Sequence, residues 1–279
     1  MTTTDQTINI TSDNIYGNCD LKCSYNYKYN QSNSVATNKG VYISLTYDKG
    51  TLAQVTYNDQ KYHVSEITIY NNSLHLFNGN KVASEIIIEH VPEMGGEFLY
   101  ICIPIISSTN TSDATLILSD IIQTVSTNAP NEGESCNLNI SNFNLNNIVP
   151  KQPFFAYNGN SGLKGNVIVY GINYAIPLND SSLSILQKII QIYPLNLTGG
   201  NLFFNKVGPN NIQLNDGIYI SCQPTGSSEE ETQVSYNNSS KINNDFAPIF
   251  NKSMKIILIC ILCIIIFALL SFGFNYFTK

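Results

Sequence analysis

The sequence contains no arginine and no tryptophan, and only 3 of its 279 residues are histidine. Arginine is the side chain best suited to bidentate binding of phosphate or sulfate, so its absence argues against a site built on such contacts. Before residue 251 there are 11 lysines against 20 acidic residues, a net charge of about −9. We therefore expect no binding to nucleic acid, and a polyanionic glycan would need a local patch of lysines.

The chain also lacks the features of a secretory leader. Its first ten residues, MTTTDQTINI, contain neither a basic stretch nor an apolar stretch. We therefore expect no signal peptide, and nothing at this end directs the chain to an oxidising compartment.

Five of the 7 cysteines precede residue 223, an odd number that leaves at least one of them unpaired within that part. Cys102 lies in a continuous apolar run and is expected to be a buried thiol. One or two disulfides are possible among the others, with Cys19 or Cys23 joined to Cys136 or Cys222.

The composition favours a β-rich domain. The chain has 17 tyrosines and 13 phenylalanines, isoleucine and valine are abundant, and helical periodicity is scarce. Apolar spacing predicts a short helix between Ala114 and Val125. A second helix is predicted from the capping cluster at residues 180–182 to Pro194. One sizeable core of about 220 residues fits this pattern.

Two consecutive strands form the most informative stretch. Apolar and polar residues alternate from Val64 to Tyr70, and Asn78-Gly79 is typical of a tight turn. The run Glu85-Ile86-Ile87-Ile88 then predicts a second strand, and the apolar run from Leu99 to Ile106 predicts a central strand.

This strand pair resembles the metal-site hairpin of the α-carbonic anhydrases, in which two His at i and i+2 on one strand and a third on its neighbour bind zinc. The segment from Ser73 to His90 keeps the family's spacing without a gap. The resemblance implies a central twisted, mostly antiparallel sheet with a few short helices over residues 1–222, weaker outside the hairpin.

The resemblance also implies that the zinc site is lost. Thr68, Tyr70 and Ile87 stand where the family has its three histidines, and these side chains are poor zinc ligands or no ligands at all. We therefore expect no metal, no other cofactor and no carbonic anhydrase activity. A metal bound elsewhere by His63, His75 and His90 is the alternative.

Further departures agree with this loss. Leu74 replaces a buried glutamate of the family, and Val41 replaces its proton-shuttling histidine. The substrate loop after Gly159 is shortened and lacks its threonine. Three residues keep the places that brace the family's hairpin, namely His75, Glu85 and His90.

The end of the sequence predicts a membrane anchor. Residues 223–253 are polar and acidic and are expected to form a flexible stalk. Residues 254–275 are predicted to form a single transmembrane helix, and residues 276–279 a short tail. Lys252 and Lys255 outnumber Lys279, so tail-anchored insertion is expected to leave the soluble domain on the cytosolic side.

The same order of parts occurs in the poxviral cell surface-binding proteins, in which a zinc-less carbonic-anhydrase-like domain is anchored in the virion membrane. This resemblance implies an outward-facing virion protein of a large DNA virus that attaches to a host-cell glycan or protein receptor. Two alternatives stay open: a structural virion protein that acts through protein contacts, and an enzyme with a relocated metal or a new activity in the old pocket. The sequence indicates neither the ligand nor the oligomeric state.

Overall fold

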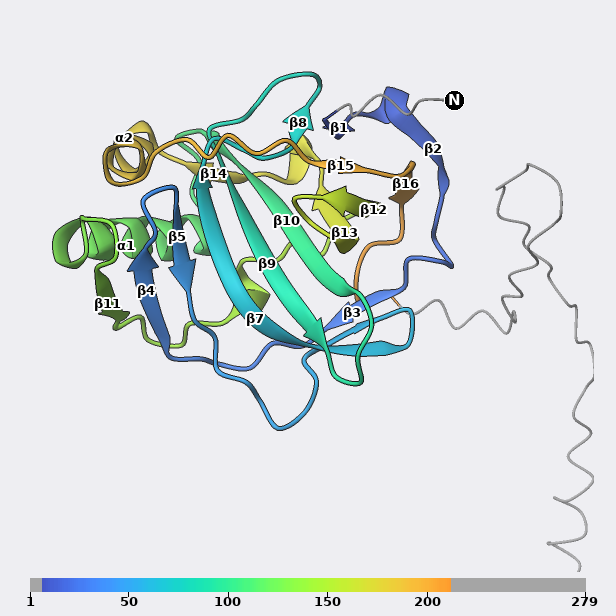
Figure 1. Cartoon of the computed structure of the whole chain (residues 1–279), viewed down its shortest axis with the longest axis horizontal. Helices are drawn as coiled ribbons and strands as arrows, with labels where there is room; N and C mark the ends of the chain where they lie inside the picture. The colour runs from blue at the N-terminus through green and yellow to red at the C-terminus, as the bar shows by residue number, and fades with distance from the viewer. Residues whose placement is uncertain (1–6, 212–279) are drawn as a thin grey trace, which may run out of the picture. The chain divides into compact units, whose positions relative to one another are not determined.

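A computed structural model describes residues 7–211 of the chain, all of which belong to one compact unit (Figure 1). Among these residues no helix is both long enough and apolar enough to cross a membrane. The predicted stalk at 223–253, the predicted membrane helix at 254–275, the tail at 276–279 and Cys222 lie outside the described residues.

Strands make up most of the regular structure in this part of the chain. They are β1 (Asn9–Ile10), β2 (Ile15–Asn18), β3 (Tyr25–Tyr27), β4 (Ser34–Asn38), β5 (Tyr42–Leu45), β6 (Val55–Tyr57), β7 (Gln60–Asn71), β8 (Leu76–Phe77), β9 (Ser84–Pro92), β10 (Phe98–Ser107), β11 (Ser135–Leu138), β12 (Phe154–Ser161), β13 (Gly165–Tyr170), β14 (Ile176–Leu178), β15 (Thr198–Gly199) and β16 (Leu202–Asn205). The helices are α1 (Asp113–Asn128) and α2 (Asp180–Ile189), with 3-10 turns at Ser12–Asn14, Leu145–Asn147 and Ile172–Tyr174.

One large twisted sheet contains all of these strands except β1 and β8, which form a separate two-stranded sheet (Figure 1). Its order is β11-β4-β5-β7-β9-β10-β13-β12-β16-β2, and β3, β6, β14 and β15 pair beside this path. Most neighbours are antiparallel, whereas β10 pairs in parallel with β13 and β14, and β16 with β2. The predicted mainly β fold with a few short helices is confirmed for the described residues.

The two faces of the sheet carry different side chains because neighbouring residues of a strand point to opposite sides. On β7, Ile67 and Ile69 belong to a core that also contains Leu118 and Ile122 of α1. Tyr70 belongs to a second apolar cluster, together with residues of β9, β10, β12 and β13. The helix side therefore supplies the main core, and the opposite side carries the positions predicted for the site.

Helix α1 confirms the helix expected between Ala114 and Val125. It begins with a reciprocal cap, in which the Ser112 hydroxyl accepts from the Thr115 amide and the Thr115 hydroxyl accepts from the Ser112 amide. Such caps satisfy amides that the first helical turn leaves without partners.

Helix α2 confirms the second predicted helix but differs at both ends. Its cap is Asn179, one residue before the predicted cluster, and the Asn179 side chain accepts from the Ser182 amide. The helix ends at Ile189 and does not reach Pro194, because the next residues are held in extended form. The Gln191 amide donates to the Gly40 carbonyl oxygen at 2.7 Å, and Asn71 donates to the Ile190 carbonyl oxygen at 3.1 Å.

The disulfide differs from the expected pairings. Cys19 is bonded to Cys23, and Cys136 is a free, half-buried thiol. The Cys23 amide donates to the Cys19 carbonyl oxygen at 2.8 Å, so a single tight turn brings the two Cα atoms to 5.3 Å. That separation lies within the range a disulfide spans, which explains why neither cysteine needs a distant partner. Cys102 is a buried free thiol, as predicted.

Candidate functional site

The strand pair β7 and β9 brings the three positions predicted for zinc onto one face of the sheet. Thr68 and Tyr70 are two residues apart on β7, and Thr68 stands directly across from Ile87 on β9. Tyr70 pairs in the same register with Glu85. Residues 68, 70 and 87 therefore lie side by side on one face of this strand pair.

The side chains at these positions are already engaged with protein groups. The Thr68 hydroxyl donates to the Ile87 carbonyl oxygen at 3.3 Å. The Tyr70 ring stacks on Tyr193, with ring centres 5.9 Å apart and an interplanar angle of 17°, and lies 5.3 Å from the Tyr42 ring. Three tyrosines from β5, β7 and the segment after α2 thus pack together over the old ligand positions.

Zinc does not fit this set of side chains. Catalytic zinc sites use three imidazole, thiolate or carboxylate ligands, whereas here a hydroxyl, a phenol and a hydrocarbon share the face. Burial raises the pKa of the Tyr70 phenol, which accordingly stays protonated at neutral pH. All three side chains are less than 10 % exposed in the folded protein.

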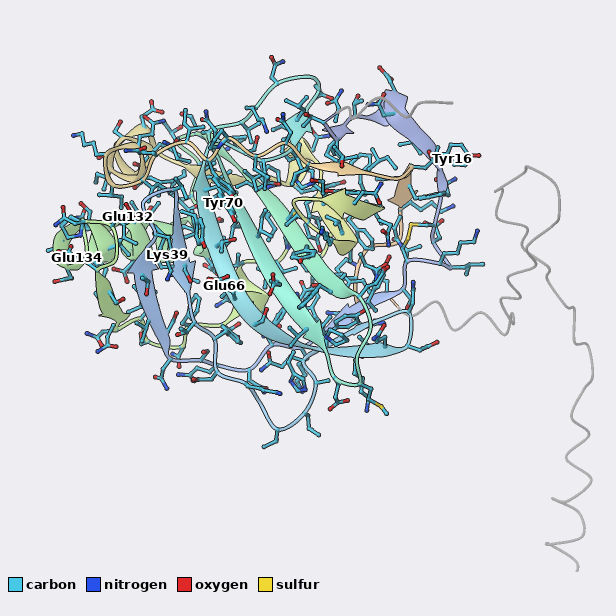
Figure 2. All side chains as sticks on the ribbon, viewed as in Figure 1. Tyr16, Lys39, Glu66, Tyr70, Glu132 and Glu134 are labelled. Atoms are coloured by element: carbon cyan, nitrogen blue, oxygen red, sulfur yellow. A yellow bond between two sulfur atoms is a disulfide. The ribbon has the colours of Figure 1, made fainter. Side chains whose placement is uncertain are left out.

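Two carboxylates beside the tyrosines were missed by the sequence analysis. Glu66 on β7 stands across from Glu89 on β9. The Ser44 hydroxyl donates to the Glu66 carboxylate, and the Ser65 hydroxyl donates to Glu89 Oε1 at 2.7 Å. Figure 2 shows Glu66 and Tyr70 along β7. The alternation of Glu66, Thr68 and Tyr70 was the available signal, since residues two apart share a face.

The acidic pair also affects the neighbouring phenols. Burial and the charge of Glu89 raise the pKa of Tyr100 to about 12. Burial, Glu66 and Tyr193 raise the pKa of Tyr42. This face therefore presents carboxylates, which accept hydrogen bonds, beside protonated phenols, which can donate them.

Below this surface, His75 and Glu85 form a buried pair. His75 Nδ1 lies 2.7 Å from Glu85 Oε1, and His75 Nε2 lies 2.8 Å from the Tyr157 hydroxyl. Glu85 Oε2 also accepts from the Leu74 and His75 amides, at 2.6 and 3.1 Å. The network joins the loop after β7 to β9 and β12, and we call His75, Glu85 and Tyr157 the brace.

The charge state of the brace follows from its bonds. Burial alone would raise the pKa of the Glu85 carboxyl, but the neighbouring His75 and the amide hydrogen bonds lower it below its usual value. Glu85 is consequently ionised at neutral pH. Replacing either partner would leave a buried polar group without its bonds.

Cys102 lies beside the brace, and its sulfur and the ligand atoms of His75 and Glu85 lie within 4.8 Å of one another. Both nitrogens of His75 and both oxygens of Glu85 already have partners. Burial and the Glu85 charge raise the pKa of the Cys102 thiol well above its usual value. These three residues form a satisfied hydrogen-bond network with an adjacent thiol, which does not fit a metal.

His90 lies in a separate buried network. Its Nδ1 donates to the carbonyl oxygens of Ile88 and Leu99, each at 3.2 Å, and its Nε2 lies 3.0 Å from the Tyr29 hydroxyl. Burial lowers the pKa of His90 to about 4, so the ring is neutral and Tyr29 donates to it. The third histidine, His63, faces Glu93 at 3.6 Å. The three histidines thus have separate partners.

The shortened loop after Gly159 is a tight hairpin between β12 and β13. Gly159 stands across from Gly165, and a Cβ atom at Gly159 would lie 1.9 Å from the Leu163 carbonyl oxygen. Only glycine fits there. Leu74 is buried in the second apolar cluster, and Val41 lines a small surface cleft beside Lys39.

Solved structures with a similar fold include α-carbonic anhydrases and dioscorin. A hyperthermostable carbonic anhydrase from an active hydrothermal vent chimney is 17% identical at a TM-score of 0.55, covering 72% of this chain and 88% of its own. The α-carbonic anhydrase of Photobacterium profundum is 14% identical at a TM-score of 0.57, covering 74% and 90%. Dioscorin complexed with ascorbate is 14% identical at a TM-score of 0.53, covering 73% and 87%.

No protein-family model and no curated protein sequence matches the chain. The predicted resemblance to α-carbonic anhydrases is confirmed at the level of the fold.

Proposed function

We propose that this chain, which has the fold of the α-carbonic anhydrases, is a zinc-independent binding protein of a virion membrane that attaches particles to a host-cell surface ligand. The proposal that the protein works without zinc is supported by the side chains at the three predicted zinc positions. Thr68 is bonded within the strand pair, Tyr70 is stacked on Tyr193, and Ile87 has no donor atom. A fold holds its shape while its site changes, so loss of the ligands does not require loss of a role.

The membrane setting of the proposal is supported by the sequence. Residues 254–275 are apolar and uncharged over most of their length, except at Lys255, and follow a polar stretch at 223–253. A soluble domain joined to a membrane by a polar stalk is suited to reach a ligand on another surface.

The charge of the chain limits the class of ligand that it can bind. With no arginine and a net charge of −6, the protein is poorly suited to hold a sulfated polymer. A neutral glycan or a protein receptor is the better match.

The test uses the full chain reconstituted into liposomes with its domain outward. Binding to cultured animal and protist cells is measured against protein-free liposomes across a salt series. Saturable binding that changes little with salt is expected, whereas a steep fall with salt would indicate a charged glycan. An absence of binding to every cell type would overturn the attachment role and favour a structural role within the particle.

Catalysis is tested on the same material. Zinc content is measured after dialysis, and CO2 hydration is compared with a boiled control. We expect zinc well below one equivalent and hydration no faster than the control. Stoichiometric zinc with rapid hydration would overturn the zinc-independent part of the proposal.

A further inference from the structure

A polar cleft lies at the β2 end of the sheet, away from the central strands β7 and β9. Its volume is about 520 Å³. Its walls come from residues 7–9, 13–16 and 200–202. The last strand in the sheet order, β2, supplies Tyr16 and pairs in parallel with β16. Figure 2 shows Tyr16 at the right edge of the described domain and Tyr70 nearer its middle, and none of Thr68, Tyr70 and Ile87 lines the cleft.

Tyr16 presents an open aromatic surface at this cleft. Tyr16 is 52% exposed. Phe203 contacts it edge to face, with ring centres 5.8 Å apart and an interplanar angle of 77°. This contact orients the Tyr16 ring without covering it. The C–H groups on one face of a sugar ring can stack on the free face of an aromatic ring that is held in this way.

Hydrogen-bonding groups stand beside that platform. The Asp13 carboxylate is exposed and receives only a long bond of 3.4 Å from the Ser12 hydroxyl. The Asn14 amide nitrogen donates to the Asn9 carbonyl oxygen at 3.1 Å, which uses its nitrogen and not its oxygen. Carboxylate and amide oxygens accept hydrogen bonds from hydroxyl groups.

The frame of the cleft is tied to the rest of the domain. The Gly79 amide donates to the Asn9 side-chain oxygen at 2.8 Å, and β1 pairs in parallel with β8. The Gly200 amide donates to the Asn158 carbonyl oxygen at 2.8 Å on the opposite wall. A wall held in this way needs little ordering when a ligand binds.

We propose that this cleft binds a neutral oligosaccharide, with Tyr16 as the stacking platform and Asp13 and Asn14 as partners for the sugar hydroxyls. The described residues that line it include one carboxylate and no lysine, so sulfated or carboxylated sugars are disfavoured. The choice of a glycan rests on the attachment role proposed above, whereas the location of the site rests on the geometry.

The first experiment measures binding of the labelled full chain, in detergent micelles, to an array of neutral, sialylated and sulfated oligosaccharides. Binding is expected for neutral members only. Tyr16→Ala is expected to weaken binding roughly tenfold or more, and Asp13→Ala roughly fivefold, because each removes a direct contact. Tyr16→Phe keeps the ring and is expected to stay within about threefold of the parent.

Leu52→Ala is the matched control, because Leu52 is 77% exposed at a position outside the cleft. Equal thermal midpoints for all variants show that the fold is kept. Failure to bind any neutral sugar, or equal binding by the parent and Tyr16→Ala, would overturn the site.

A second experiment separates this site from the attachment role. Cell binding is measured for liposomes that carry the parent protein and for liposomes that carry the Tyr16→Ala variant. Cell binding that survives Tyr16→Ala overturns the cleft as the attachment site and leaves attachment standing. Tyr16-dependent binding to the array without any cell binding supports the cleft and overturns attachment.

Discussion

Thr68 and Ile87 face each other across β7 and β9, and the Thr68 hydroxyl donates to the Ile87 carbonyl oxygen at 3.3 Å. Two of the three positions at which zinc is expected in this fold are therefore engaged with each other. The third, Tyr70, packs against Tyr42 and Tyr193. The three predicted positions thus share one face, and none of their side chains is a typical zinc ligand.

This geometry predicts that the site can be rebuilt. The triple change Thr68→His, Tyr70→His and Ile87→His places three imidazoles on one face and is expected to retain about one zinc per chain after dialysis. Ile87→His alone offers one imidazole and is expected to retain almost none. Metal analysis of both variants and the parent provides the measurement. A well-folded triple variant without zinc would mean that the strands have moved away from the zinc-binding frame.

The brace is expected to carry a large share of the stability of the strand pair. Glu85→Ala leaves His75 and two buried amides without their partner, and a loss of about 3–5 kcal/mol in the free energy of unfolding is expected. Tyr157→Phe removes one hydrogen bond and is expected to cost about 1 kcal/mol. Urea unfolding measures both.

Glu89→Ala is the matched control, because Glu89 lies on the same strand but is only half-buried. Its loss is expected to stay near or below about 1 kcal/mol. A brace variant that loses no more stability than this control would contradict the assignment.

His90 predicts a pH dependence of stability. Its pKa is about 4 in the folded protein, against 6.5 as the ordinary value. Between these values the unfolded chain binds a proton at this histidine and the folded chain does not, so stability falls as pH drops from 6.5 towards 4. The full loss amounts to about 3 kcal/mol for this shift. Above pH 6.5 the residue contributes no slope.

Urea unfolding at intervals between pH 7 and 4.5 tests this dependence before most carboxylates take up protons. His90→Gln removes the titrating ring, and the slope in this window is expected to become smaller. A slope as steep as that of the parent would assign the effect to other groups.

Removal of the disulfide between Cys19 and Cys23 is expected to lower stability only modestly. The double change Cys19→Ser and Cys23→Ser opens a very short loop and is expected to lower the free energy of unfolding by about 2 kcal/mol. Cys136→Ser, at a free thiol, is expected to change it much less. Peptide mapping under non-reducing conditions should find Cys19 and Cys23 joined within one peptide, and a cross-link from either one to Cys136 would contradict the structure.

Local patterns in the sequence predicted many of the strands and both helices of the fold. Alternation predicted β7 and the apolar run predicted β9, whereas only the resemblance to the α-carbonic anhydrases singled out Thr68 and Ile87, and the structure supplies their register. Apolar spacing placed both helices. The cap at Asn179 was missed because neighbouring Asp180 and two serines offer similar capping chemistry, and only the backbone shows which residue precedes the first turn.

Contacts between segments that are distant in the chain could not be predicted from the sequence. Tyr42, Tyr70 and Tyr193 come from three separate parts of the chain, and no spacing rule relates them. The cleft at Tyr16 is likewise built from two segments that are almost two hundred residues apart. The pairing of Cys19 with Cys23 depends on a backbone turn that the sequence does not encode by a recognisable signal.

The division of the sheet into two faces has a consequence for how such a chain evolves. The helix side holds Ile67, Ile69 and α1 in one tightly packed core, so substitutions there are limited by volume. The opposite side is held by the brace and by the second apolar cluster. On that side, positions outside the brace and this cluster can change one residue at a time without loss of buried packing, and a recognition surface can evolve there while the fold is kept.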